Sequence, residues 1–483
     1  MRKIADLNFA SAVLGWDQEV YMPVGSSDAR AQQLGTLAGI AHELFTAPEL
    51  GELLSLLEKD ESLSPEEKLN IKKSSKDYKD KKKYTNEFVI ELSRCTSEAF
   101  QAWDYARKNN DYNHFAPSLQ KLIVLKQKET ELLGYTSHPY DALLDQFEPG
   151  MTTVKLEKLF SEVKSALVPF VKEIVAKKPV DDSFLKQNYD SDKQWNFGIE
   201  LLKNMNFDFN IGRQDISSHP FTTSFSSKDV RVTTRINVND LREMIWSCIH
   251  EGGHALYEQG LPESQYGLPW GEASSLAVHE SQSRIWENNV GRSLAYWKYH
   301  YADLQKIFPE NLLNISLELF YKSINKVEPS FIRTAADELT YHFHIMIRYE
   351  MEKGIIEGSI PVNEIPKQWN AKYKEYLGID VPTDALGVLQ DIHWSHGGFG
   401  YFPTYSLGSF YAAQYFACAK KNIPGLLELI EKGDYKLLLD WLRKNIHVHG
   451  RLYTAEELCE RITGETLQFK YFFEYAKEKF GNI

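Results

Sequence analysis

Apolar residues recur at intervals of three and four positions along most of the chain, which is the spacing of a helix with one buried face. Two clear stripes are Phe88, Leu92, Cys95, Ala99, Trp103 and Ala106, and Leu156, Leu159, Val163, Leu167, Phe170 and Ile174. Because such a stripe buries one helix face against a neighbouring helix, its role is structural. The pattern therefore predicts a mainly α-helical body.

One segment, residues 221–238, departs from this pattern and reads FTTSFSSKDVRVTTRINV. It is rich in β-branched residues that alternate with others at Val230, Val232, Thr234, Ile236 and Val238. This alternation predicts a small β-hairpin or sheet that turns near residues 226–228. Asp240 then has the position of an N-cap for the next helix, with Glu243 three residues later to complete a capping box.

The chain contains no low-complexity linker and no internal repeat, and prolines separate the helical segments. We therefore expect residues 1–483 to form one continuous domain. A helical body of this length has room for two lobes around a groove.

The composition limits the possible partners. Apolar residues make up 43% of the 483 positions, so the chain can bury a substantial core. Acidic residues outnumber basic residues by 67 to 55, and the formal net charge is -12. Because phosphate binding requires a basic face, nucleic acid is a poor candidate partner. No run of about 18 apolar residues is present, so no membrane span is expected.

The cysteines and the N-terminal residues bear on the compartment. The cysteines are Cys95, Cys248, Cys418 and Cys459, which lie far apart and include no CxxC. Neither a disulfide framework nor a cysteine zinc site is expected, and a reducing compartment fits. Asp6 and Asn8 interrupt the apolar start of the chain, so it does not resemble a signal peptide. We predict a cytoplasmic location.

The strongest chemical signal is the sequence HEGGH at residues 250–254. Residues four apart lie on one face of a helix, so His250 and His254 can bind one ion together. Neutral imidazole suits zinc, and a catalytic zinc typically takes three protein ligands and a water. Glu251 is offset by about 100° around the helix, where it can remove a proton from that water.

Two further observations concern the surroundings of this motif. Gly252 and Gly253 each weaken a helix by about 1 kcal/mol relative to alanine, so two in succession suggest that a neighbouring helix or a bound peptide approaches closely. A third ligand can come from the predicted helix at residues 271–290, which offers His279, Glu280 and Glu287. Spacing alone does not choose among them, although the adjacent His279 and Glu280 point about 100° apart.

Several ordered segments resemble the carboxypeptidase Taq family of thermostable metallocarboxypeptidases. They are LGWDQEVYMP at 14–23, DVRVT at 229–233, HEGGHALYEQG at 250–260, HESQSRIWEN at 279–288, IRTAAD at 332–337, GVLQDIHW at 387–394 and FGYFPTYSLG at 399–408. The match runs from near residue 14 to the C-terminal region, and its ordered motifs are far more specific than HExxH alone.

This resemblance implies a largely helical fold with a deep active-site groove, similar to that of neurolysin and angiotensin-converting enzyme. It implies Glu280 as the third ligand, zinc or cobalt as the metal, and a homodimer. The implied activity is the release of C-terminal amino acids from peptides with broad specificity, with Glu251 as general base.

The segment HWSHGGFGYFPTY supplies donors for the oxyanion that forms during peptide hydrolysis. Its candidates are His393, His396, Tyr401 and Tyr405. By comparison with the helical peptidases named above, His393 and Tyr405 align best as catalytic residues. Tyr401 is a candidate for substrate binding, and core packing in this aromatic loop is the alternative.

An exopeptidase must recognise a free C-terminal carboxylate, and the planar fork of arginine binds a carboxylate through two hydrogen bonds. Arg333 in the IRTAAD motif is the candidate, and Gln390 could add a further hydrogen bond. The alternative for Arg333 is a structural salt bridge to Asp337, four residues later. Asp337 or Glu338 could also hold the outer nitrogen of a ligand histidine.

Two other functions remain open. A zinc oligoendopeptidase of the same fold would cut inside short peptides, but Arg333 and the QDIHW segment argue against it. A non-catalytic peptide-binding scaffold stabilised by zinc would have no need of Glu251 as a base.

Overall fold

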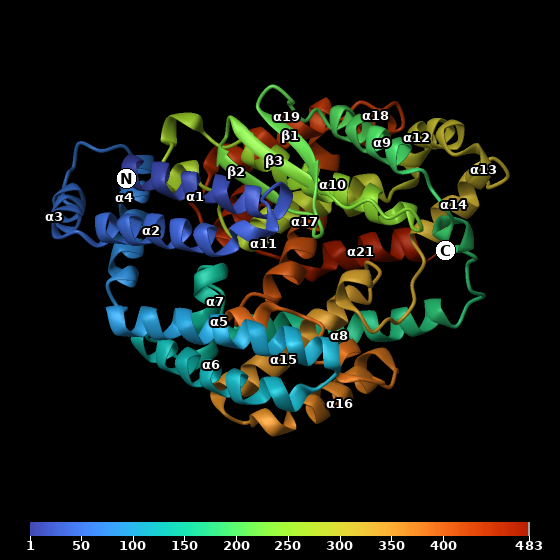
Figure 1. Cartoon of the computed structure of the whole chain (residues 1–483). Coiled ribbons are helices and arrows are strands. Elements are labelled where there is room, and N and C mark those ends of the chain that lie inside the picture. The colour runs from blue at the N-terminus through green and yellow to red at the C-terminus, as the bar shows by residue number, and fades with distance from the viewer. Residues whose placement is uncertain (482–483) are drawn as a thin grey trace. The chain divides into compact units, whose positions relative to one another are not determined.

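The computed structural model describes residues 1–481 and is mainly α-helical with one small sheet (Figure 1). The predicted fold class is therefore confirmed. The chain divides into two compact units. The first unit comprises residues 1–79, 180–324 and 408–471, and the second comprises residues 80–179 and 325–407 and the C-terminal residues from 472. The chain passes from one unit to the other within α4 (Pro65–Lys81), α17 (Pro403–Asn422) and α21 (Phe469–Phe480).

The first unit contains the sheet and most of the shorter helices. Its helices are α1 (Arg2–Val20), α2 (Ser27–Thr46), α3 (Pro48–Leu57), α9 (Ser191–Asn204), α10 (Leu241–Glu258), α11 (Leu276–Arg284), α12 (Leu294–Ile307), α13 (Pro309–Leu312), α14 (Leu317–Ile324), α18 (Leu426–Ile430), α19 (Lys436–Asn445) and α20 (Ala455–Thr463). A π-helical segment, Ile285–Gly291, continues α11. α10 contacts β2, β3, α9 and α11 and so lies at the centre of this unit.

The sheet has three strands in the order β1-β3-β2. β2 (Thr222–Ser226) and β3 (Asp229–Thr234) form the predicted antiparallel hairpin, and β1 (Gly212–Ile216) adds a parallel strand that the sequence pattern did not predict. Val230 and Val232, two positions apart, are fully buried. The prediction that the alternation continues to Val238 is wrong, because β3 ends at Thr234 and Val238 is exposed.

The start of α10 bears out one half of the capping prediction. The side chain of Asp240 accepts a hydrogen bond from the backbone N–H of Arg242, as an N-cap does. Glu243 does not complete a capping box, and that half is wrong. Its carboxylate instead accepts from Asn237 Nδ2 and pairs with Arg235, so it ties the preceding loop to the helix.

The second unit is built from longer helices. They are α5 (Asn86–Asn109), α6 (Tyr112–Leu133), α7 (Pro139–Phe147), α8 (Thr153–Val175), α15 (Tyr341–Glu357) and α16 (Ile365–Leu377). α5 and α6 run side by side (Figure 1). The predicted stripe of α5 is buried except for Leu92, which is half-buried. In α8 the buried stripe includes Phe160 and Val171, whereas Leu159 and Phe170 are half-buried.

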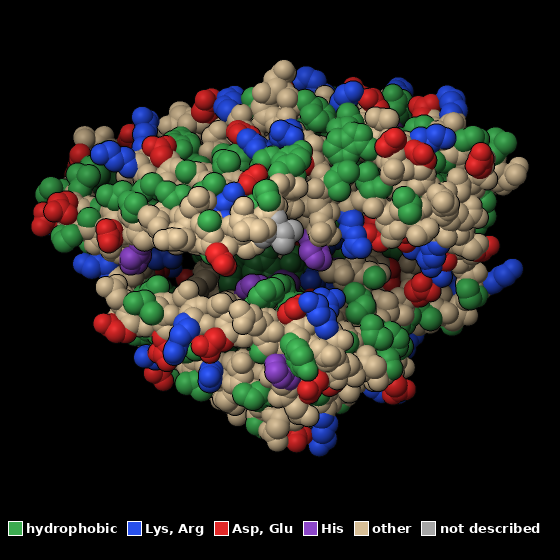
Figure 2. Space-filling model, viewed as in Figure 1, with side chains coloured by type: hydrophobic (Ala, Val, Ile, Leu, Met, Phe, Trp, Pro, Cys, Tyr) green, Lys and Arg blue, Asp and Glu red, His purple; other side chains and the backbone are tan. Residues whose placement is uncertain are grey.

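The surface is polar and mixed in charge. Figure 2 shows lysine and arginine side chains interspersed with aspartate and glutamate over the visible face. None of the helices in the described part of the chain combines the length and the apolar character that a membrane crossing requires. All four cysteines are free, as expected. The single domain with two lobes around a groove stays a prediction.

Candidate functional site

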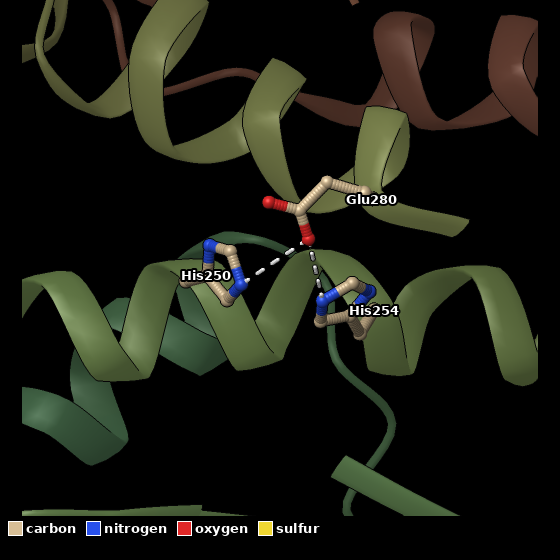
Figure 3. A group of neighbouring side chains, drawn as sticks. All are labelled: His250, His254 and Glu280. Atoms are coloured by element: carbon tan, nitrogen blue, oxygen red, sulfur yellow. Dashed lines mark ion pairs between the residues drawn. The ribbon is translucent and has the colours of Figure 1, made fainter. Parts of the chain in front are cut away.

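Three side chains of the first unit converge on one point (Figure 3). His250 and His254 are one turn apart on α10, and Glu280 comes from α11. Glu280 Oε2 lies 3.7 Å from His250 Nε2 and 3.5 Å from His254 Nε2. Two ligand atoms that each lie about 2.1 Å from a tetrahedral ion are themselves about 3.4 Å apart. The spacing therefore fits a divalent ion held among the three side chains.

The two glycines of the motif explain how α10 and its neighbours come so close. A Cβ on Gly253 would lie 2.6 Å from the Cα of Ser283 in α11, and a Cβ on Gly252 would lie 2.7 Å from Leu202 Cδ2 in α9. The close approach inferred from the sequence is confirmed, and the neighbours are helices. A Cβ on Gly408 would likewise lie 2.5 Å from Glu280 Cγ. Close packing thus brings α11 against α10 and the Glu280 side chain against Gly408.

The charge of Glu280 suits a metal ligand. Glu280 is 6% exposed, and Arg284 Nε donates to its Oε1 at 2.6 Å. Burial alone would raise the pKa of this carboxyl, but Arg284 and the two histidines hold it well below its ordinary value. Glu280 therefore presents an anionic oxygen to two imidazole nitrogens, which is a donor set that zinc and similar divalent ions accept.

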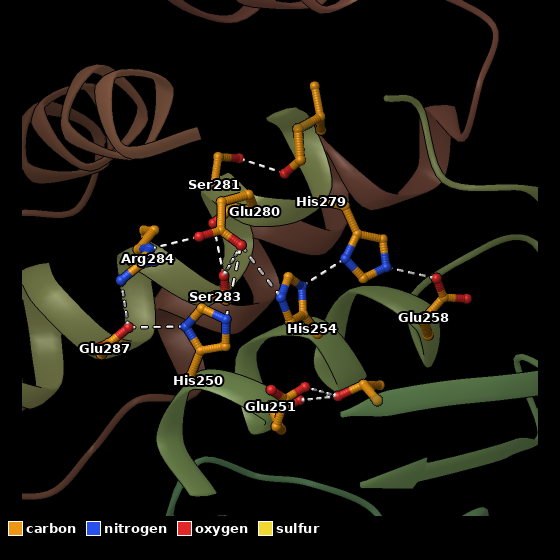
Figure 4. Close-up of polar contacts among 12 residues, drawn as sticks. His250, Glu251, His254, Glu258, His279, Glu280, Ser281, Ser283, Arg284 and Glu287 are labelled. Atoms are coloured by element: carbon orange, nitrogen blue, oxygen red, sulfur yellow. Dashed lines mark hydrogen bonds and ion pairs between the residues drawn. The ribbon is translucent and has the colours of Figure 1, made fainter. Parts of the chain in front are cut away.

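The outer nitrogen of His250 is held by Glu287, another of the three residues left open as a third ligand (Figure 4). His250 Nδ1 lies 2.8 Å from Glu287 Oε2. Arg284 and Arg292 donate to the same carboxylate at 2.9 and 3.0 Å, so it stays anionic although it is buried. Glu287 belongs to the π-helical segment after α11, and segments of this kind are frequent at functional sites.

The outer nitrogen of His254 is held by an imidazole. His279 Nδ1 lies 2.5 Å from His254 Nδ1, and its Nε2 lies 2.7 Å from Glu258 Oε1 (Figure 4). Ser224 Oγ on β2 donates to the other oxygen of Glu258 at 2.7 Å. Burial and the neighbouring His279 lower the pKa of His254 to about 3, so its ring is neutral, as a ligand requires.

The prediction that Asp337 or Glu338 holds the outer nitrogen of a ligand histidine is wrong. Asp337 instead accepts hydrogen bonds from the backbone N–H groups of Leu339 and Thr340, and Glu338 forms a buried ion pair with Lys479. The sequence could not identify Glu287 and His279 in this role, because the choice depends on how α11 packs on α10.

Replacing Glu287 with glutamine should weaken the binding of a divalent metal ion by about 10- to 100-fold, because the anion that orients His250 and raises its basicity is lost. Competition with a chromophoric zinc chelator measures this affinity directly. Glu263→Gln, at an exposed glutamate of the same unit, is the matched control. An unchanged affinity in the Glu287 variant would show that the contact has no part in metal binding.

Glu251 lies on α10 beside the ligand group and is 8% exposed. The hydroxyl of Thr222 on β2 lies 2.7 Å from Glu251 Oε2 and 2.9 Å from the Glu251 carbonyl oxygen. Burial raises the pKa of this carboxyl, which increases its affinity for a proton. A buried carboxylate with a raised pKa, fixed by a neighbouring hydroxyl, has the properties of a general base.

A separate group of predicted residues gathers in the second unit. Arg333 starts a short 3₁₀ turn, Arg333–Ala335, and is 7% exposed. Its Nε donates to Asp391 Oδ1 at 3.0 Å, and its Nη1 donates to Tyr341 Oη at 3.1 Å. The salt bridge to Asp337 that the sequence offered as the alternative is wrong, because Asp391 is the partner. Among the described residues, Arg333 Nη2 donates no hydrogen bond.

Arg348 makes this group electropositive. It is fully buried on α15, and its Nε donates to Asp391 Oδ2 at 2.6 Å. Asp391 thus bridges two guanidinium groups, which hold its pKa well below the ordinary value although burial alone would raise it. The two guanidinium groups and the one carboxylate leave this buried group with a net positive charge. Asp391 and Arg348 were not predicted, although Asp391 lies in the quoted motif GVLQDIHW.

The remaining predicted residues belong to the same unit. The ring of His393 lies 5.4 Å from that of Tyr401 and 6.4 Å from that of Tyr405, and Arg333 Cζ lies 5.0 Å from the Tyr405 ring. Burial lowers the pKa of His393 to about 4, so its imidazole is neutral near pH 7.

Gln390 has internal contacts on both sides of its amide. Its Oε1 accepts from the backbone N–H of Arg333 at 2.9 Å, and its Nε2 lies 3.0 Å from the carbonyl oxygens of Phe331 and Gly387. These contacts join the segment that carries Arg333 to the GVLQDIHW segment. A direct contact of Gln390 with a substrate stays a prediction.

Comparison with known proteins agrees with this chemistry. The family model described as Carboxypeptidase Taq (M32) metallopeptidase matches residues 1–480. The chain is 38% identical to Carboxypeptidase 1 of Bacillus subtilis, over 100% of this chain and 97% of that protein. A solved structure of an M32 carboxypeptidase from Deinococcus radiodurans has a TM-score of 0.97 at 36% identity, covering 100% of this chain and 97% of the other. The structure of a protein named CHT has a TM-score of 0.98 at 58% identity, covering 99% and 97%.

Proposed function

This chain belongs to the carboxypeptidase Taq (M32) metallopeptidase family and is a metallocarboxypeptidase, and on that premise we propose that it holds zinc through His250, His254 and Glu280. The observation that carries the proposal is that one ligand atom of each of these three residues lies within 4.8 Å of the others. Cobalt is the alternative metal implied by the sequence resemblance.

In the proposed mechanism, a divalent ion, when bound, polarises the peptide carbonyl and lowers the pKa of its water. The carboxylate of Glu251 accepts a proton from the attacking water. It then passes this proton to the nitrogen of the leaving amino acid. The raised pKa of Glu251 supports the return of that proton. The hydroxyl of Thr222 orients the carboxylate for both transfers.

Arg333 binds the C-terminal carboxylate of the peptide in this proposal. Its Nε is held by Asp391 and its Nη1 by Tyr341, which leaves Nη2 to donate to the carboxylate of the peptide. The buried charge of Arg348 keeps the group net positive, so an anion is attracted there. Gln390 acts mainly by bracing the backbone of Arg333.

His393 and Tyr405 are the proposed donors to the oxyanion, and Tyr401 contacts the substrate beside them. A neutral imidazole and a phenol each offer a hydrogen to a developing negative charge without a net charge of their own. The neutral state of His393 near pH 7 supports this role.

A peptide with a free C-terminus and its C-terminally amidated copy should be hydrolysed at very different rates. We expect kcat/KM to be about 10- to 100-fold lower for the amide, because one charge-assisted hydrogen bond to a buried guanidinium is lost. Mass spectrometry of the products also shows which end shortens. Equal rates, with cleavage inside the peptide, would favour the oligoendopeptidase alternative.

Broad specificity for the released residue, a homodimer and a cytoplasmic location are further parts of the proposal. They rest on the sequence resemblance and on the pattern of cysteines. Sedimentation of the purified enzyme checks the dimer.

A further inference from the structure

The loop from Asp391 to Tyr401 carries His393 and lies against α15 in the second unit. Two buried charged residues of α15, Arg348 and Glu352, are one helical turn apart and both contact this loop. Opposite charges at this spacing on a helix commonly pair with each other. Here each of them is hydrogen-bonded to the loop instead.

Arg348 holds the beginning of the loop. It is fully buried, and its Nε donates to Asp391 Oδ2 at 2.6 Å, while its Nη1 donates to the carbonyl of His344 at 2.8 Å. The guanidinium also lies over the Trp369 ring, with Cζ 4.7 Å from the centroid. A side chain with contacts on several sides has little freedom to move.

Glu352 holds the rest of the loop. Its carboxylate is fully buried and accepts three hydrogen bonds: from Trp394 Nε1 at 2.8 Å, from the backbone N–H of Gly400 at 2.9 Å, and from Tyr140 Oη at 2.6 Å. Tyr140 belongs to α7, so a single carboxylate joins two points of the loop to two helices.

The backbone at Gly400 shows how closely the loop lies on α7. Gly400 has φ +94°, which favours glycine, and a Cβ there would lie 2.7 Å from the carbonyl carbon and oxygen of Leu143. The loop therefore has no room to shift toward α7 at this point.

A buried carboxylate is costly, and an apolar side chain of similar size is often as stable in such a place. Burial raises the pKa of Glu352 to about 7, although the three donors and Arg348 oppose the shift. A buried carboxyl group kept at this position, with its three hydrogen bonds directed at one loop and its supporting helix, suggests a role in positioning rather than in stability.

We propose that Glu352, with Arg348 one turn before it, is a positioning residue that holds the segment from Trp394 to Gly400 and thereby fixes the imidazole of His393. This inference rests on the proposed role of His393 as a donor to the oxyanion. Glu352 does not touch the reacting atoms.

The test uses the full-length, metal-loaded enzyme with Glu352→Gln, which keeps the size of the side chain but turns an amide N–H₂ toward one of the donors. We expect kcat to fall about 10- to 100-fold, as for small displacements of a catalytic group, with KM and metal content unchanged. Hydrogen exchange of the peptide covering 394–400 should become faster. Glu352→Met has a side chain of similar size without hydrogen-bond acceptors. It should also lower kcat and speed exchange, and it replaces the glutamine variant if that variant folds poorly.

A double-mutant cycle with His393→Ala separates positioning from general damage. If Glu352 acts through His393, the glutamine substitution should reduce kcat much less in the His393→Ala background than in the wild type. Glu357→Gln, at an exposed position on the same helix, should leave kcat and exchange unchanged.

Three results would contradict different parts of this proposal: the positioning role of Glu352, its restraint of residues 394–400, and the role of His393. Fully multiplicative losses in the cycle would overturn the positioning role of Glu352. If hydrogen exchange of residues 394–400 is unchanged in both Glu352 variants, Glu352 does not restrain this segment. Full activity of His393→Ala alone would instead refute the proposed role of His393, while exchange would still decide whether Glu352 holds the loop.

Discussion

Replacing Glu251 with glutamine should lower kcat about 1,000-fold or more while the protein keeps its full complement of metal. General acid–base catalysis typically contributes about 100- to 10,000-fold, and Glu251 performs both proton transfers in the proposed mechanism. Glutamine preserves the shape of the side chain and its contact with Thr222 but cannot accept the proton. Turnover of a short peptide and metal analysis of the same sample provide the two measurements.

The metal analysis distinguishes loss of the general base from loss of the metal. Glu251 lies outside the ligand group, so the substitution should leave the metal in place. Glu310→Gln, at an exposed glutamate of the same unit, controls for the loss of one negative charge. Unchanged turnover in the Glu251 variant would refute the general-base mechanism, and a wild-type enzyme that binds zinc but hydrolyses no peptide would support the scaffold alternative.

Replacing Arg333 with methionine should lower kcat/KM for peptides with a free C-terminus by about 100-fold. Truncating one partner of a buried, hydrogen-bonded charge pair typically costs about 2 to 5 kcal/mol, and the substrate carboxylate would lose such a partner. The amidated peptide has no carboxylate to lose, so its kcat/KM should change little. The ratio between the two peptides should therefore fall toward one.

Two further variants make the result specific. Arg333→Lys keeps the positive charge but not the planar fork, so it should restore only part of the preference for the free C-terminus. Arg94→Met, on the exposed face of α5 in the same unit, should change neither rate. If the Arg333 variants retain the wild-type preference for the free carboxylate, another residue recognises the C-terminus.

The sequence was most informative where the determinants are local. Spacing of apolar residues predicted α5 and α8, because one buried stripe is enough to define an amphipathic helix. It could not predict β1, whose sequence GRQDI has no alternation and is held as a strand by its pairing with β3. The capping box failed for a similar reason, since Glu243 finds Asn237 and Arg235 in the folded loop.

The chemistry of the site divides in the same way. The spacing of His250 and His254 on one helix is a local property, and it predicted their convergence. The choice of Glu280 over His279 and Glu287 needed the family resemblance, because all three lie close to the histidines once α11 packs on α10. The ion-pair partner of Arg333 could not be predicted from local spacing, because Asp391 is 58 residues away in the sequence.

The close packing at Gly253 has a consequence for the loss and uptake of metal. Because α10 and α11 meet at the backbone of Gly253, their separation follows from packing between the helices. We therefore expect the metal-free protein to keep its fold and to take up metal again without refolding.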